Sequence, residues 1–296
     1  MRLVTYTSTA GWRCGIDRDD GIADTHSVAR VAGFAEADVA ALQTNRDVVG
    51  LEASALADLA AAAGADDVEV HARDAVRLGP PIPDPQKIIC LGLNYRDHAH
   101  ESGLQPPAAP MFFAKFANSL AGPFDEIVPP ASTQKVDYEA ELAVVIGRRG
   151  RSISEADALG HVAGAMALND VSARDLQLAN TLWTGGKAVD TFAPCGPSLV
   201  LMDEIADLQD LRVRARVNGE VVQDGTTASM IFGVAPTIAF LSQIMTLEPG
   251  DIIATGTPAG VGQSRTPPLF LHTGDLVEVE IDGLGVLRNR IAAPIG

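Results

Sequence analysis

Two glutamates spaced two residues apart are the first candidates for chemistry in this chain. Glu139 and Glu141 stand in Val-Asp-Tyr-Glu-Ala-Glu-Leu-Ala-Val-Val-Ile-Gly (136–147), whose apolar second half is typical of a buried strand. Side chains two positions apart on a strand point to the same face. Two carboxylates on one face repel each other, so a divalent cation is the simplest explanation for the pair. Asp170 is the candidate for a third acidic ligand.

A histidine and a glutamate three residues apart form a second candidate group. His98 and Glu101 follow an apolar strand that we predict at residues 87–93. On a short helical turn the two side chains would face the same way and could hydrogen-bond, which would orient the histidine as a general base. From the spacing alone, a solvated polar turn is the more frequent explanation.

A lysine after two glycines is the third candidate. Lys187 ends Trp-Thr-Gly-Gly-Lys (183–187), and glycines let the backbone pass close to a ligand. The lysine could supply a positive charge to an anionic group. An exposed lysine on a flexible loop would show the same pattern.

Charge and cysteine content exclude several classes of protein. The net charge of −16 in 296 residues argues against binding to nucleic acid or to anionic membranes, whereas a small anionic substrate needs only a local cation. Cys14, Cys90 and Cys195 are far apart, which predicts neither a zinc site nor a disulfide framework, and the last two are expected to be buried thiols. The N-terminus does not resemble a signal peptide, and no apolar run approaches the ~20 residues of a membrane span. We therefore expect a cytoplasmic protein.

Proline marks the best domain boundary. Residues 79–86 are proline-rich, which predicts a linker between a small N-terminal domain at residues 1–78 and a catalytic domain at 87–296. The first domain is expected to hold short strands and a helix at residues 51–63. The second is expected to hold many strands and few helices, including a helix beginning at Ser154 and another at 229–241. Without a regular strand–helix alternation, the fold class is a mixed, β-rich α+β fold.

Five motifs, in this order, resemble the fumarylacetoacetate hydrolase family over residues 85–289. They are Gly-Leu-Asn-Tyr-Arg-Asp-His-Ala-His-Glu (92–101), Asp-Tyr-Glu-Ala-Glu-Leu-Ala-Val-Val-Ile-Gly (137–147), Asn-Asp-Val-Ser-Ala-Arg-Asp-Leu-Gln (169–177), Gly-Lys-Ala-Val-Asp-Thr-Phe-Ala-Pro-Cys-Gly-Pro (186–197) and Leu-Glu-Pro-Gly-Asp-Ile-Ile-Ala-Thr-Gly-Thr-Pro-Ala-Gly-Val-Gly (247–262). The branch resembled includes acylpyruvases, fumarylpyruvate hydrolases and 2-hydroxyhepta-2,4-diene-1,7-dioate isomerases. Ala188-Val189 departs from the Ser-Phe that many members carry after the lysine.

The resemblance implies a rolled mixed sheet, a small variable N-terminal domain, a homodimer and one Mg²⁺ or Mn²⁺ per subunit. It implies roles for nine residues: Glu139, Glu141 and Asp170 as metal ligands; His98 and Glu101 as a catalytic dyad on a mobile lid; Lys187 as an active-site cation; and Arg174, Gln177 and Thr257 as substrate contacts. His100 stands beside the dyad, but only His98 has the spacing to Glu101.

The function implied is hydrolysis of a carbon–carbon bond in an acylpyruvate-type 2,4-diketo acid, through an enolate that the metal stabilises. Two alternatives use the same site: decarboxylation of an oxaloacetate-type 2-oxo acid, and isomerisation of a 2-hydroxy-dienedioate in aromatic catabolism. An inactive metal-binding scaffold would be expected to lack the dyad or the lysine, and both are present. A carboxylate cluster that holds no metal would be supported if chelation left stability and activity unchanged.

Overall fold

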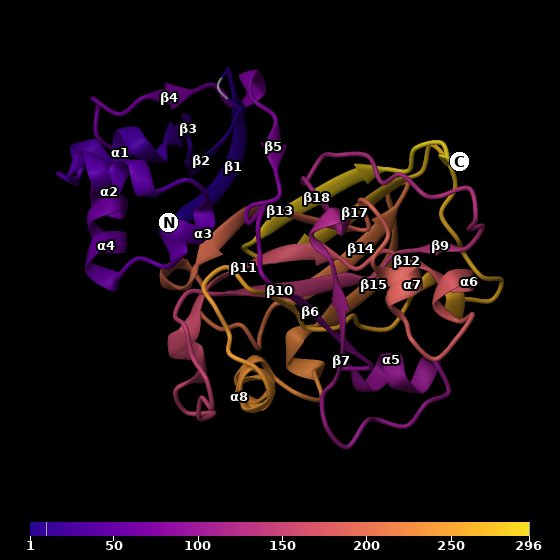
Figure 1. Cartoon of the computed structure of the whole chain (residues 1–296). Coiled ribbons are helices and arrows are strands. Elements are labelled where there is room, and N and C mark those ends of the chain that lie inside the picture. The colour runs from indigo at the N-terminus through magenta and orange to yellow at the C-terminus, as the bar shows by residue number, and fades with distance from the viewer. Residues whose placement is uncertain (10, 296) are drawn as a thin grey trace.

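The computed structural model describes residues 1–9 and 11–295 and is organised around one large mixed sheet (Figure 1). Its strands are β1 (Arg2–Ser8), β2 (Gly11–Arg18), β3 (Gly21–Asp24), β4 (Val70–His71), β5 (Leu78–Gly79), β6 (Ile88–Gly92), β7 (Met111–Lys115), β8 (Leu120–Ala121), β10 (Ala140–Ile146), β11 (Val162–Asn169), β13 (Ala193–Leu201) and β16 (Ile252–Ala254). They run in the order β4-β3-β2-β1-β13-β11-β10-β16-β6-β7, with β5 paired to β1 and β8 to β13. The pairs β16–β6 and β13–β8 are parallel, and the other ladders of this sheet are antiparallel.

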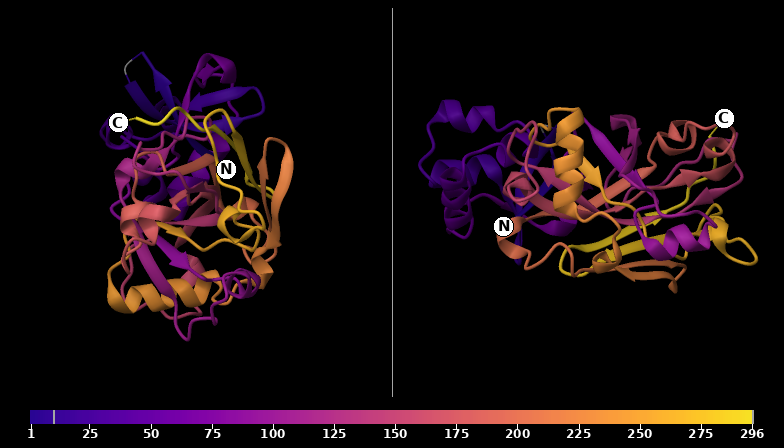
Figure 2. Two further views of the ribbon diagram at one scale, coloured as in Figure 1. Left: turned by 90° about the vertical axis from the view of Figure 1, so that its right-hand side faces the viewer. Right: turned by 90° about the horizontal axis from the view of Figure 1, so that it is seen from below.

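Two smaller sheets complete the β-structure. One consists of β15 (Glu220–Thr226), β14 (Arg212–Val217), β17 (Leu276–Ile281) and β18 (Gly285–Arg290), in that spatial order. The other pairs β12 (Ser172–Ala173) with β9 (Val136–Asp137). Figure 2 shows the four-stranded sheet packed against the body of the molecule. This sheet-rich arrangement confirms the mixed, β-rich α+β fold class.

Helices are few and short, and they lie around the sheets (Figures 1 and 2). They are α1 (Thr25–Val31), α2 (Glu36–Ala41), α3 (Asn45–Val49), α4 (Ala53–Ala62), α5 (Arg96–Glu101), α6 (Arg174–Gln177), α7 (Thr184–Lys187) and α8 (Val234–Ile244). None of the helices in the described part of the chain is long and apolar enough to cross a membrane.

Strand β10 is buried on both faces, which explains why its sequence is a continuous apolar run rather than an alternating one. Leu142 and Val144 face the core shared with the four-stranded sheet and α8. Ala143 and Val145 face a second core that includes side chains of the N-terminal helices. Glu141 has the same parity as Ala143, so its side chain belongs to the face of this second core.

The N-terminal part shares the large sheet with the rest of the chain. β1 pairs with β13 through the registers Arg2↔Val200 and Leu3↔Leu199. The proline-rich connection is also held in place, because the carbonyl of Pro81 accepts hydrogen bonds from Thr5 Oγ1 at 3.0 Å and Asn45 Nδ2 at 2.9 Å. β1 therefore links the N-terminal strands to the strands that carry the acidic residues.

Two helix predictions need correction. The helix expected from Ser154 is absent: Ser154 does accept a hydrogen bond from the Asp157 backbone, but only turns and a short 3₁₀ segment, Ala158–His161, follow before β11 begins. Pairing with β10 and β13 recruits the residues from Val162 onward into the sheet. The helix expected at residues 229–241 is displaced and forms at α8, with Pro236 in its first turn, where no intrahelical N–H is required.

Candidate active site

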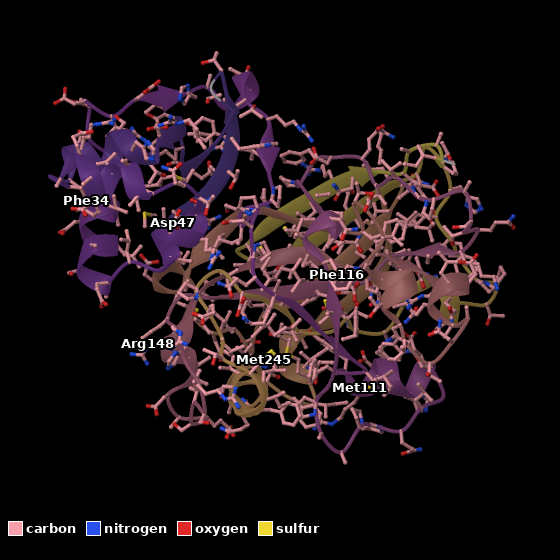
Figure 3. All side chains as sticks on the ribbon, in the orientation of Figure 1. Phe34, Asp47, Met111, Phe116, Arg148 and Met245 are labelled. Carbon is pink, nitrogen blue, oxygen red and sulfur yellow. The ribbon has the colours of Figure 1, made fainter. Side chains whose placement is uncertain are left out.

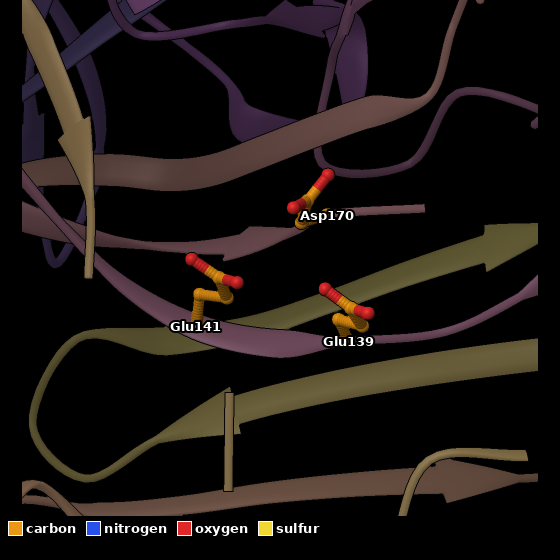
Figure 4. Close-up of side chains that lie close together, drawn as sticks. All are labelled: Glu139, Glu141 and Asp170. Atoms are coloured by element: carbon orange, nitrogen blue, oxygen red, sulfur yellow. The ribbon is translucent and has the colours of Figure 1, made fainter. Parts of the chain in front are cut away.

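Glu139, Glu141 and Asp170 come together as the sequence predicts. One carboxylate oxygen from each lies within 4.8 Å of the others, and all three side chains are buried. Figure 4 shows Glu139 and Glu141 rising from one stretch of chain toward Asp170. The backbone fixes this meeting, since Asp170 N–H donates to the Glu139 carbonyl at 2.9 Å and Ala140 pairs with Asn169.

Lys187 lies inside this acidic cluster rather than on an exposed loop. Its Nζ is 2.7 Å from Glu139 Oε2 and 2.7 Å from Asp170 Oδ2, and the side chain is 2% exposed. Burial lowers the pKa of Lys187, but the charges of Asp170 and Glu139 outweigh burial and raise it above its usual value. The short helix α7 delivers the lysine, and Gly186 permits this, because a Cβ there would lie 2.4 Å from the Gln177 nitrogen.

The two glutamates experience opposite electrostatic environments. Burial raises the pKa of Glu139, but Lys187 and Arg174 outweigh it and bring the pKa down to about 2. Burial, together with the charges of Asp170 and Glu139, raises the pKa of Glu141 well above its usual value. Glu141 accepts a hydrogen bond from Gly256 N–H at 2.9 Å, but no ion pair joins it to a lysine or arginine of the described residues.

Arg174 and Gln177 form a second layer around Glu139. Arg174 Nη1 lies 2.7 Å from Glu139 Oε1, its Nε donates to Asp137 Oδ2 at 2.8 Å, and Nη1 also donates to Gln177 Oε1 at 3.0 Å. Arg174 Nη2 is buried and has no hydrogen-bond partner among the described residues. Arg174 and Gln177 both line a cavity beside the cluster.

Asp137 is a buried anchor that the sequence analysis missed. Besides Arg174, it accepts hydrogen bonds from the backbone N–H groups of Gly262 at 2.7 Å and Gln263 at 3.0 Å. A Cβ at Gly262 would lie 1.9 Å from the Leu269 carbonyl oxygen, so glycine is required at this point. Asp137 has the same strand parity as Glu139 and Glu141, and that parity was the available signal for it.

Lys115 is the second buried charge that the sequence analysis missed. Its Nζ donates to Asp170 Oδ1 at 2.6 Å and to the Val171 carbonyl at 3.1 Å, and its side chain is fully buried. A lysine at the end of a strand is normally solvent-exposed, so its type alone gave no reason to place it at the site.

His98 and Glu101 form the predicted pair on the first turns of α5. His98 Nδ1 lies 2.8 Å from Glu101 Oε1. A carboxylate can only accept, so Nδ1 carries the proton and Nε2 is the basic nitrogen. Glu101 Oε2 accepts in turn from Gly260 N–H at 2.9 Å. His98 is buried, whereas His100 on the same helix is exposed, which agrees with the choice of His98 over His100.

One cavity of about 410 Å³ brings these groups together. Its polar lining contains the dyad, Glu139, Glu141, Lys187, Arg174 and Gln177. Thr257 also lines it, but its hydroxyl donates to the Ala140 carbonyl at 2.9 Å, so that proton is already used in this arrangement. The apolar lining consists of Leu91, Leu93, Leu104, Phe113, Leu178, Trp183 and Val261.

The acidic cluster fits a hard divalent cation. Its donors are carboxylate oxygens without histidine or cysteine, the donor set that Mg²⁺ and Mn²⁺ prefer. Glu141 supplies the specific evidence, because it is a buried carboxylate without an ion-pair partner in the described chain. Glu139, Glu141 and Asp170 are therefore the residues that would hold the ion.

Comparison with known proteins agrees with this geometry. The family model described as fumarylacetoacetate (FAA) hydrolase C-terminal matches residues 87–292. Oxaloacetate tautomerase FAHD2A, mitochondrial, of Homo sapiens is 48% identical over 229 residues, which cover 77% of this chain and 73% of the relative.

Solved structures give the same result over the whole length. The fumarylacetoacetate hydrolase of Exiguobacterium antarcticum has a TM-score of 0.81 and 36% identity, and the match covers 99% of both chains. The maleylpyruvate hydrolase of Sphingobium has a TM-score of 0.76 and 32% identity, and the match covers 99% of this chain and 100% of that one. The sequence resemblance is thus confirmed, and the chain belongs to the fumarylacetoacetate hydrolase family of enzymes.

Proposed function

We propose that this chain is a divalent-metal-dependent enzyme that interconverts the keto and enol forms of oxaloacetate or a closely similar 2-oxo acid. One observation carries the proposal: a histidine–glutamate pair lines the same cavity as Lys187 and two carboxylates of the buried cluster, Glu139 and Glu141. Relatives from Homo sapiens and Xenopus laevis bear the name oxaloacetate tautomerase, which supports oxaloacetate as the first substrate to test.

The substrate's carboxylate would be recognised by Arg174 and Gln177. Arg174 lines the cavity, and a carboxylate is a strong acceptor for a guanidinium group. Gln177 Oε1 already accepts from Arg174, so its Nε2 is the end that can donate to a substrate. Together they would fix which end of the acid faces the acidic cluster.

A cation held by Glu139, Glu141 and Asp170 would polarise the 2-oxo group and favour negative charge on its oxygen. Lys187, already raised in pKa and therefore protonated, adds positive charge from within the same cluster. The chain thus surrounds the carbonyl end of the substrate with groups that favour an enolate.

His98 would move the proton. Its Nε2 accepts a proton from C3 of the keto form while the electrons of that C–H bond form the C2–C3 double bond and place charge on the carbonyl oxygen. The imidazolium, stabilised by Glu101, then returns the proton to that oxygen to give the enol. The reaction is an isomerisation, so atoms and electrons balance without a co-reactant.

Hydrolysis of an acylpyruvate is the second candidate, and the apolar part of the cavity favours it. Phe113 and Trp183, whose rings meet edge to face at 5.6 Å, provide space and contact area beyond the polar groups. An acyl chain on the far side of a diketo acid could occupy that space. In this reaction His98 would take a proton from water, and the hydroxide would attack the distal carbonyl. The carbon–carbon bond would then break to release a carboxylic acid and the enolate of pyruvate, which would take up the proton.

A substrate panel with Mg²⁺ or Mn²⁺ separates these functions. The disappearance of the oxaloacetate enol band reports tautomerisation, pyruvate formation reports decarboxylation, and loss of diketo acid absorbance reports hydrolysis. We expect metal-dependent acceleration of the enol–keto exchange that His98→Gln removes. Hydrolysis of acylpyruvates with no effect on oxaloacetate exchange would contradict the tautomerase proposal and favour the second candidate.

We also propose that the enzyme is a homodimer, the assembly that the sequence resemblance implies. Light scattering should then give about twice the chain mass of 30.9 kDa. A scattering mass equal to that of one chain would contradict this.

A further inference from the structure

Strand β7 sends two side chains into the acidic cluster from the edge of the large sheet. Figure 3 labels Met111 and Phe116, which mark the beginning of this strand and the residue after its end. Phe113 and Lys115 are two positions apart on β7 and therefore share a face. Phe113 lies under Lys187, with Nζ 5.1 Å from the ring centroid, and Lys115 reaches Asp170.

The two oxygens of Asp170 are divided between two lysines. Lys115 Nζ binds Oδ1 at 2.6 Å, and Lys187 Nζ binds Oδ2 at 2.7 Å. Lys187 also contacts Glu139 and lines the cavity, whereas Lys115 does not line it. The carbonyl of Val171 accepts a second hydrogen bond from Lys115 at 3.1 Å, which ties its ammonium group to the backbone beside Asp170.

The turn after Lys115 also holds the segment that follows Lys187. Asn118 Nδ2 donates to the Ala188 carbonyl at 3.1 Å and to Asp190 Oδ1 at 2.5 Å. The Asn118 carbonyl accepts from Thr191 N–H at 3.2 Å. Residues 115–118 therefore contact both Asp170, a candidate metal ligand, and the backbone that follows Lys187.

We propose that Lys115 is a positioning residue for the metal site, acting through Asp170. Its ammonium group holds Oδ1, so that Oδ2 lies on the side of Glu139, with which it shares Lys187 Nζ. This is the orientation in which Asp170 would share a cation with the two glutamates. This inference rests on the proposed function, because it requires that Glu139, Glu141 and Asp170 bind a divalent ion. Lys115 orients the Asp170 carboxylate and balances part of its charge, without contacting the substrate.

Calorimetric titration of the full-length protein with MnCl₂ or MgCl₂ tests the proposal. Lys115→Met should bind the ion about 10- to 100-fold more weakly than the wild type, the usual effect of losing a group that orients a metal ligand. The rise in melting temperature on adding the ion should shrink correspondingly, and this difference is measurable even in a variant of lower stability. Lys115→Gln, which shortens the side chain but keeps a donor, gives the same comparison if Lys115→Met does not fold.

Lys87→Met is the matched control. Lys87 Nζ also pairs with a fully buried aspartate, Asp251, at 2.7 Å, but this pair takes no part in the cluster. We expect the control to lose stability and to keep the wild-type affinity for the ion. An equal loss of affinity in Lys87→Met would overturn the proposal, since it would show that removing the lysine from any buried aspartate is enough.

The wild-type titration distinguishes a failure of the metal site from a failure of the role assigned to Lys115. A wild-type protein that binds neither ion would contradict the metal site itself, and with it the proposed function. A wild-type protein that binds the ion, together with a Lys115 variant of unchanged dissociation constant, would overturn only the role of Lys115.

Discussion

His98 Nδ1 lies 2.8 Å from Glu101 Oε1, within one turn of helix α5. The other oxygen of Glu101 accepts from Gly260 N–H, so the pair is tied to the loop that follows β16. A Cβ at Gly260 would lie 2.3 Å from the Val222 carbonyl oxygen, which leaves only glycine to make this contact. The histidine is thus oriented by a carboxylate that is itself held by the backbone.

Replacing the histidine should reduce turnover without unfolding the protein. We expect His98→Gln to lower kcat by about 10²- to 10⁴-fold, the usual contribution of a positioned acid–base group. His100→Gln is the control, because His100 is exposed on the same helix and does not line the cavity. Equal losses in the two variants, measured at saturating oxaloacetate and metal, would rule out the assignment of His98 as the base.

The two glutamates should respond in opposite directions to neutralisation. In chelator-treated protein at neutral pH, Glu141→Gln should raise the melting temperature, because Glu141 is a buried carboxylate whose pKa is raised by burial and by its neighbours Asp170 and Glu139. A group with a raised folded pKa costs stability above its unfolded pKa. Glu139→Gln should lower the melting temperature, because it separates Lys187 and Arg174 from their partner.

Adding Mg²⁺ or Mn²⁺ should reverse the order of wild type and Glu141→Gln. A ligand at 100 times its dissociation constant stabilises a protein by about 2.7 kcal/mol, and the variant should lose most of this gain. Differential scanning fluorimetry with chelator and with metal measures both halves of the prediction. If Glu141→Gln is destabilised in chelator as much as Glu139→Gln, our account of the charge distribution is wrong.

A methyl group at Gly92 should change substrate preference. Gly92 lines the cavity, and a Cβ there would lie 2.5 Å from Trp183 Cζ3 and 2.9 Å from Met111 Cε, so these side chains must shift. Gly92→Ala should lower kcat/KM for long-chain acylpyruvates more than for oxaloacetate, by roughly tenfold for the loss of a well-fitted apolar contact. Gly64→Ala, where a Cβ meets nothing within 4 Å, is the control. An equal reduction of kcat/KM for all substrates would contradict contact between the acyl chain and the apolar lining of the cavity near Gly92.

Acid should destabilise the N-terminal part of the fold, because it protonates Asp24. Burial raises the pKa of Asp24, but hydrogen bonds from Arg13 at 2.7 Å and Tyr6 at 2.7 Å outweigh burial and lower it. The stability that follows from a lowered folded pKa is present above the unfolded pKa of about 3.9 and is lost as the pH falls through the folded value.

Asp24→Asn should therefore cost about 1–3 kcal/mol near pH 7, and the difference from wild type should shrink below pH 4. Urea denaturation at several pH values measures this. The exposed pair Arg18–Asp20 provides the control, because Asp20→Asn should change stability by less than about 1 kcal/mol. A pH-independent cost of Asp24→Asn would exclude the ionised carboxylate as its cause.

Strand alternation and short helical spacing predicted much of the site. Glu139 and Glu141 share a face because of their parity, and His98 and Glu101 meet because they lie one turn apart on α5. These relations are local, so a single sequence contains them. The meeting of Asp170 with the glutamates is not local: its residue type made it a candidate, and the family resemblance implied its place as the third ligand.

Buried charged side chains whose partners lie in distant segments of the chain could not be predicted from the sequence. Lys115 and Asp137 are buried charges whose partners are far along the chain, and their residue types normally indicate solvent exposure. The short helices α1 and α3 were missed for a different reason. They are set by single caps, Asp24 and Thr44, and by packing on the sheet, since helices of this length are not stable alone.

The pairing of β1 with β13 has a consequence for any shortened form of the protein. Without β1, the N–H and C=O groups around Leu199 and Val200 would lose their partners, and an open strand edge is a template for intermolecular pairing. Apolar side chains of the second core, Leu199 among them, would be uncovered at the same edge. The N-terminal strands therefore cover one edge of the strands that carry the acidic cluster, and this protects the protein from aggregation.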